Sequence, residues 1–156
     1  MINCNNYLGH VMKIVTWNLR RPNYNSEDRN TKIISALKEV KADILILTET
    51  NSIINPGTEY TSKATNSLPG AGNICIAGDF NISFSDNFYY TKEGRQKITS
   101  SFEELQIANL TQSIPQNMDH IAISKSFLKS MKCTEQIWID DKRLSDHIGV
   151  SIMLDR

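Results

Sequence analysis

In Ala42-Asp43-Ile44-Leu45-Ile46-Leu47-Thr48-Glu49, a nearly continuous apolar run ends in a carboxylate. A short apolar run of this kind predicts a strand that is covered on both faces, as in α/β proteins. A second predicted strand, Lys13-Ile14-Val15-Thr16-Trp17-Asn18-Leu19, precedes it. Between the two strands, apolar residues recur at helical spacing at Ile33, Ile34, Leu37 and Val40. Strand, helix and strand in this order predict a β-α-β unit and an α/β fold.

The second half of the chain is predicted to follow the same order of elements. A strand near 73–78 is followed by a helix near 92–106, in which Ile98, Phe102 and Leu105 share one apolar face. The remaining predictions are a strand at 119–123, a helical turn at 126–130, and strands at 134–139 and 148–154. Because Cys75 lies inside an apolar strand, we expect it in the core.

Length and charge narrow the class of protein. A chain of 156 residues predicts one domain, residues 1–156. Lysine plus arginine and aspartate plus glutamate number 17 each, which argues against a protein that grips a duplex through many basic contacts. The three cysteines form neither a disulfide framework nor a zinc motif. The first twelve residues do not resemble a signal peptide, and no apolar run reaches membrane-spanning length, so we expect a cytoplasmic protein without a membrane segment.

The tetrapeptide Gly78-Asp79-Phe80-Asn81 follows the apolar run Ile74-Cys75-Ile76-Ala77. Strand alternation places Asp79 and Asn81 on the same face at the end of the strand. An aspartate positions or deprotonates a water, and an asparagine amide donates to a developing negative oxygen, so the pair points to hydrolysis of a charged ester. The alternative is turn chemistry, because Gly, Asp and Asn are favoured in turns for backbone reasons.

Further polar residues mark the ends or starts of other predicted strands: Asn18, Glu49, Asp119 with His120, and Asp146 with His147. Ligand sites in layered α/β proteins collect where strands meet loops. Alternation sends His120 to the face opposite Asp119, so we expect a structural role for it; solvation or capping is the alternative for the acids. An oxygen-rich set suits Mg²⁺ or Mn²⁺ better than zinc, which indicates metal-assisted displacement at phosphorus.

Five motifs occur in one order: Thr16-Trp17-Asn18, Leu47-Thr48-Glu49, Gly78-Asp79-Phe80-Asn81, Met118-Asp119-His120-Ile121 and Ser145-Asp146-His147. Over residues 13–51 and 73–154 the chain resembles the endonuclease/exonuclease/phosphatase superfamily, which includes DNase I-like and exonuclease III-like enzymes. The resemblance implies a four-layer α/β sandwich with two mixed β-sheets packed face to face. It also implies a hydrolase that cleaves phosphodiesters with Mg²⁺ or Mn²⁺, and a nuclease in particular.

The resemblance assigns a role to each matching residue. Its metal residues are Glu49 as the principal ligand, Asn18 beside it, and Asp146 as a second contributor. Its catalytic residues are Asp79, which activates the attacking water; Asn81, which binds the scissile phosphate; His147, which stabilises charge in the transition state; and Asp119, which hydrogen-bonds that histidine.

The chain departs from the family between Glu49 and Gly78. Relatives carry a long middle section there, whereas residues 50–72 form only a short connector here. We therefore expect a reduced version of the sandwich that retains the metal site, with weaker metal affinity and turnover. The alternative is a catalytically compromised or minimised fragment with weak or no metal binding. The substrate stays open among nucleic acid and small or lipid phosphodiesters; a basic groove for nucleic acid would draw on Arg20, Arg21, Lys92, Arg95 and Lys97.

Overall fold

The computed structural model describes residues 11–55 and 73–156. Seven strands and three helices follow one another in this part of the chain: β1 (Met12–Asn18), α1 (Glu27–Glu39), β2 (Ile44–Thr48), β3 (Cys75–Asp79), α2 (Lys92–Glu104), β4 (Ile107–Asn109), β5 (Asp119–Ser124), α3 (Lys125–Leu128), β6 (Lys132–Ile139) and β7 (Gly149–Asp155). No helix among these residues is long and apolar enough to cross a membrane. The predicted α/β class is confirmed.

The strands form two sheets. The larger has the order β2-β1-β7-β6; β1 and β2 are parallel, and the other pairs are antiparallel. The predicted β-α-β unit is therefore present as β1-α1-β2. In the smaller sheet, with order β3-β5-β4, β5 is antiparallel to both neighbours. It follows that β3 and β4 are parallel, so that β3-α2-β4 is a second β-α-β unit, split by β5. Only the larger sheet is mixed.

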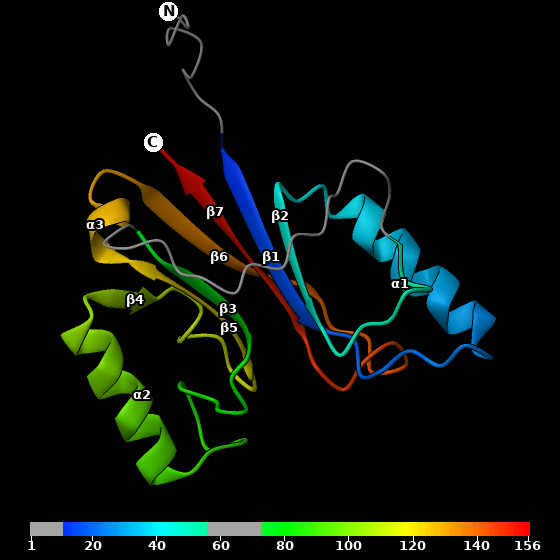
Figure 1. The fold of residues 1–156 in the computed structure, drawn as a ribbon, viewed down its shortest axis with the longest axis horizontal. Coiled ribbons are helices and arrows are strands. Elements are labelled where there is room, and N and C mark those ends of the chain that lie inside the picture. Colours follow the sequence, from blue (N-terminus) through cyan, green and yellow to red (C-terminus); the bar gives the residue numbers. More distant parts are fainter. Residues whose placement is uncertain (1–10, 56–72) are drawn as a thin grey trace, which may run out of the picture.

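The two sheets pack face to face, α1 and α2 lie on the outside, and α3 lies at one end of the sandwich (Figure 1). Alternation along β1 builds this arrangement. Ile14 points toward the smaller sheet and packs in one cluster with Ile121 of β5 and Ile152 of β7. Trp17 points the other way and packs with Ile33 and Leu37 of α1. The order of layers is thus α1, larger sheet, smaller sheet, α2.

Two predictions about individual residues, Cys75 and Leu105, are wrong, and the strand predicted to be covered on both faces is partly exposed. Cys75 is exposed rather than in the core; among the described residues β3 lies at one edge of its sheet. Ile44 is 43 % exposed, and in the part of the chain that the structure describes its strand β2 lies at one edge of the larger sheet. Leu105 follows the last turn of α2 and is 60 % exposed, whereas Phe102 is half-buried, so the two do not share one covered face.

The short strand β4, Ile107–Asn109, has no counterpart among the predicted elements. It contains only three residues, too few for strand alternation to be read from the sequence. The predicted connector is described only as far as residue 55, and Ile54 in it is buried against Trp17 and Ile33. The remainder of the connector, 56–72, lies outside the described residues, as do the first ten residues.

Candidate functional site

The topology brings five strand ends to one end of the sandwich. Strands β1 and β2 are parallel, so Asn18 and Thr48 are register partners and Glu49 comes directly after them. Because β7 runs antiparallel to β1, the Asp146-His147 pair that precedes it lies at the same end. In the smaller sheet, Asp79 and Asp119 are register partners. The predicted acids, amides and imidazole therefore approach one another from both sheets.

A hydrogen bond from Asn18 to Asp79 joins the two sheets. Asn18 Nδ2 lies 3.1 Å from Asp79 Oδ2, and the backbone N–H of Asn81 donates to Asp79 Oδ1 at 2.8 Å. Both carboxylate oxygens of Asp79 are thus held in place. Gly78 makes the approach possible: its φ is +135°, and a Cβ there would lie 3.2 Å from the Thr48 methyl group.

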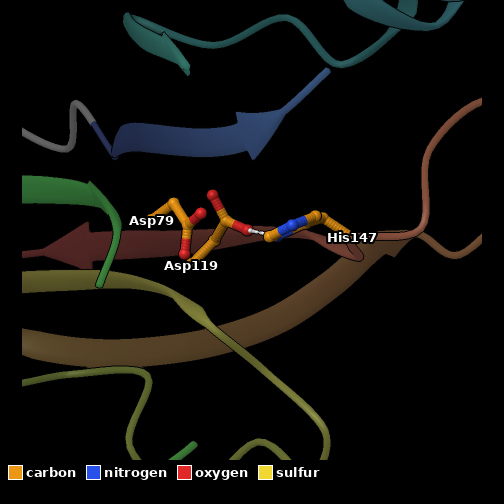
Figure 2. Close-up of side chains that lie close together, drawn as sticks. All are labelled: Asp79, Asp119 and His147. Atoms are coloured by element: carbon orange, nitrogen blue, oxygen red, sulfur yellow. Dashed lines mark hydrogen bonds and ion pairs between the residues drawn. The ribbon is translucent and has the colours of Figure 1, made fainter. Parts of the chain in front are cut away.

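A second contact between the sheets pairs Asp119 with His147. Nδ1 of His147 lies 2.7 Å from Asp119 Oδ2, and only 1 % of the Asp119 side chain and 12 % of the His147 side chain is exposed (Figure 2). Asp119 shares its face of β5 with the core residues Ile121 and Ile123, which explains its burial. The hydrogen bond that the resemblance implied between these two residues is present.

The pairing controls the charge of His147. Burial opposes the charged imidazole, but the hydrogen bond and negative charge of Asp119, with smaller contributions from Asp79 and Asp146, outweigh it and raise the pKa of His147. For Asp119 the effect of burial has the other sign: burial disfavours the charged carboxylate and raises the pKa of Asp119, while the hydrogen bond to His147 lowers it. The arrangement favours a protonated imidazole that donates through Nδ1.

The turn that carries His147 is fixed by buried groups. The Ser145 hydroxyl donates to the carbonyl of Asn18 at 2.7 Å and accepts the backbone N–H of His147 at 3.1 Å. The Trp17 indole donates to the carbonyl of His147 at 3.2 Å. Through Asn18, the same network reaches Asp79, so the two contacts between the sheets are linked.

Glu49 and Asp146 lie at the rim of this arrangement. Nε of Arg21 is 3.5 Å from Glu49 Oε2, and Nε of Arg20 is 3.5 Å from Asp146 Oδ2; both pairs are largely exposed. At these distances and exposures the pairs are weak. Arg20, Arg21, Glu49 and Asn81 all have positive φ, and the clustering of such backbone at one place is typical of functional sites.

The described residues contain one group of acidic and imidazole ligand atoms within 4.8 Å of one another: Asp79, Asp119 and His147. Figure 2 shows the three side chains pointing toward one another. Oδ1 of Asp119 is buried and forms no hydrogen bond with any described residue. A buried carboxylate oxygen without a donor, beside a second carboxylate, is suited to a cation. Glu49 and Asp146 are not members of this group, and Asn18 contributes by holding Asp79.

His120 has the structural role that alternation predicts. It is fully buried, its Nε2 lies 2.8 Å from the carbonyl of Ile82, and its Nδ1 lies 3.2 Å from Asn117 Nδ2. Asn117, which the sequence reading did not single out, also bonds both backbone groups of Asp119. An Asn two residues before a strand is a signal for such side-chain turns and would have identified it.

The group formed by Asp79, Asp119 and His147 can orient a water and place positive charge beside it. Comparison with known proteins adds no identification: neither a protein-family model nor a curated protein matches this chain.

Proposed function

We propose that this chain is a Mg²⁺- or Mn²⁺-dependent phosphodiesterase of the nuclease class, related to the endonuclease/exonuclease/phosphatase superfamily. The observation that carries the proposal is the position of Asp79 beside the Asp119–His147 pair. A fixed carboxylate next to an imidazole of raised pKa provides the two functions that phosphodiester hydrolysis needs, orientation of a water and stabilisation of negative charge.

Asp79 is the group that orients and deprotonates the attacking water. Its two oxygens accept hydrogen bonds from Asn18 Nδ2 and the backbone of Asn81, so the carboxylate cannot rotate freely. Restricting a catalytic carboxylate in this way lowers the entropic cost of reaching the reactive geometry. The Asn81 side chain is exposed at the end of the strand, where it can donate to a phosphate oxygen.

His147 is the group that donates to the phosphate oxygens. Its Nδ1–H is held by Asp119, and within the described part of the chain Nε2 forms no hydrogen bond, which leaves the Nε2–H of the charged ring available to substrate. Asp119 keeps the ring oriented and charged. Negative charge that develops on the phosphoryl oxygens is then met by a donor that is already in place.

The donor set fits a hard divalent cation. Asp79 and Oδ1 of Asp119, to which none of the described residues donates a hydrogen bond, supply oxygen ligands within one group. Glu49, Asn18 and Asp146 are the further metal residues implied by the resemblance, and Glu49 and Asp146 would have to release Arg21 and Arg20 to take part. When bound, such an ion lowers the pKa of a coordinated water and stabilises charge on phosphoryl oxygens.

Hydrolysis of bis(4-nitrophenyl) phosphate with Mg²⁺, with Mn²⁺ and with EDTA tests the proposal. We expect metal-dependent turnover that falls by about 100-fold or more in Asp79→Asn. Asp28→Asn is the matched control, because Asp28 lies on α1 and pairs only with Lys32 in the described structure. Absence of metal-dependent hydrolysis by the wild-type protein would overturn the proposal.

A second candidate is a catalytically compromised scaffold with weak or no metal binding. The observation that favours it is the position of Glu49 outside the ligand group, paired with Arg21. Calorimetric titration with Mn²⁺ separates the candidates. Binding that is lost in Glu49→Gln would favour the enzyme, whereas no detectable binding by the wild-type protein would favour the scaffold.

A further inference from the structure

An aromatic groove adjoins the candidate site on the side of Asn81. It has a volume of about 570 Å³ and is lined by residues 80–82 and 87–91. Three consecutive aromatic side chains, Phe88, Tyr89 and Tyr90, are exposed there, and Phe88 and Tyr89 are each 53 % exposed. Asn81 belongs both to this groove and to the hydrogen-bonded turn around Asp79. A substrate whose phosphate reaches Asn81 therefore has the aromatic rings beside it.

The loop that presents these rings is built around Asp86. One carboxylate oxygen of Asp86 accepts hydrogen bonds from the Ser83 hydroxyl and, at 3.0 Å, from the backbone N–H of Phe88. The other accepts the backbone N–H of Gln116 at 2.7 Å. These bonds lower the pKa of Asp86, first through the Ser83 hydroxyl, so the carboxylate stays charged and keeps its donors.

Buried His120 fixes the start of the same loop. Its Nε2 bonds to the carbonyl of Ile82, and its ring packs edge-on against Phe84 with 4.8 Å between ring centroids. Because the loop is ordered before anything binds, stacking on its rings would cost little conformational entropy. The exposed rings are therefore held in position by hydrogen bonds of the loop that carries them.

Positive charge accompanies the rings. The Arg95 guanidinium lies 3.9 Å from the centroid of the Tyr90 ring, and its Nη2 donates to the carbonyl of Asp86. Cations next to exposed aromatic rings are a common arrangement for single-stranded nucleic acid, in which bases stack and phosphates are attracted. The chain has no net charge, which disfavours tracking a duplex by phosphate contacts alone.

We propose that Phe88 and Tyr89 form a base-stacking subsite next to the scissile phosphate, and that the substrate is a single-stranded nucleic acid. The inference rests on the proposed function for the position of the phosphate, but its test reads binding and needs no turnover. Tyr90, whose ring already contacts Arg95, is assigned to holding that cation near the groove.

Binding of a single-stranded tetranucleotide that contains 2-aminopurine, followed by its fluorescence, tests the subsite. The measurement is made in Mg²⁺ with Asp79→Asn, in which hydrolysis is suppressed. We expect Phe88→Ala and Tyr89→Ala each to weaken binding about 5- to 100-fold, the range found for loss of one stacking ring. Tyr89→Phe should bind like the parent, because it keeps the ring. Tyr24→Ala is the matched control, since Tyr24 is exposed but lies outside the groove.

Two further ligands make the outcome specific. A tetranucleotide backbone without bases should bind the parent and the ring variants alike, and a duplex of the same sequence should bind less tightly than the single strand. The proposal is overturned if both alanine variants bind the tetranucleotide normally, if they lose the baseless strand equally, or if no strand binds. It is also overturned if the rings are needed only for phosphatidylglycerol vesicles. If the tetranucleotide binds through the rings but wild-type protein hydrolyses no phosphodiester, the proposed function fails, and what stands is a base-stacking site that binds single-stranded nucleic acid.

Discussion

Two Asp-His dipeptides, Asp119-His120 and Asp146-His147, precede or begin strands of different sheets and reach opposite environments. His120 is enclosed among aromatic rings, and burial lowers its pKa despite its hydrogen bonds. His147 meets the carboxylate of Asp119 across the sheets, and its pKa is raised. The partners that hydrogen-bond each imidazole are residues other than the aspartate directly before it in sequence. For Asp119 and His120, position on opposite faces of β5, and not sequence adjacency, determines which acid meets which imidazole.

The largest difference between the two histidines is expected in catalysis. In the proposed enzyme, His147→Gln should lower kcat for bis(4-nitrophenyl) phosphate by about 100- to 10,000-fold, because glutamine can donate a hydrogen bond but carries no positive charge. Circular dichroism should show that the variant is folded. A variant with wild-type kcat would remove His147 from the chemistry and leave the Asp119 pair with a structural role alone.

For His120 the largest effect is expected in stability. His120→Ala removes a fully buried ring that packs against Phe80 and Phe84, and it leaves the carbonyl of Ile82 without its donor. We expect a loss of about 2–4 kcal/mol in the free energy of unfolding, measured by urea denaturation. The matched variant His147→Gln should lose less, because glutamine keeps a hydrogen-bond donor for the buried carboxylate of Asp119. Equal losses would mean that the two environments do not differ energetically.

The sequence predicts the different environment of His120 because apolar residues alternate clearly along its strand, β5. Ile121 and Ile123 identify the face of β5 that packs against the larger sheet. Asp119 must therefore point toward the larger sheet, and His120 must point to the opposite face of β5. The same argument fails for Cys75, because a residue type and a strand pattern do not reveal whether the strand is central or at an edge. Edge position depends on the pairing of distant strands, which β3 has on one side only among the described residues.

The candidate site was predictable to a similar extent. Strand ends alone identify Asn18, Asp79, Asp119 and His147, which the two contacts between sheets bring together. They do not predict that Glu49 and Asp146 pair with arginines at the rim, because that depends on the positive-φ turn at Arg20 and Arg21. The aromatic groove was not predictable from the sequence either, since a sequence does not distinguish exposed from buried aromatic residues.

Asp119→Asn sharpens the comparison by removing the charge that distinguishes the two histidines. The pKa of His147 should fall, because burial, which disfavours the imidazolium, would no longer be opposed by Asp119. The cost in stability should be about 1.5–3 kcal/mol, the range for a hydrogen bond to a charged group. NMR titration of the two imidazoles measures the change, and His120, whose ring does not bond the Asp119 side chain, is the internal control. An unchanged titration of His147 would contradict the assignment of Asp119 as its charge partner.

The smallest expected effect is the pH dependence of stability, and it has opposite signs for the two residues. The folded-state pKa of His147 lies above its ordinary value of 6.5, so its stabilising contribution is complete below pH 6.5 and disappears as the pH rises through the raised value. The folded-state pKa of His120 lies below 6.5, so its contribution is present above pH 6.5 and disappears as the pH falls through the lowered value. Urea denaturation from pH 5 to pH 9, taken as the difference between wild type and variant so that remote carboxyl groups cancel, isolates each one. His147→Gln should remove a decline in the free energy of unfolding on the alkaline side, and His120→Gln should remove a decline on the acidic side. The same sign for both variants would mean that the two imidazoles experience the same environment, despite the different acids and rings around them.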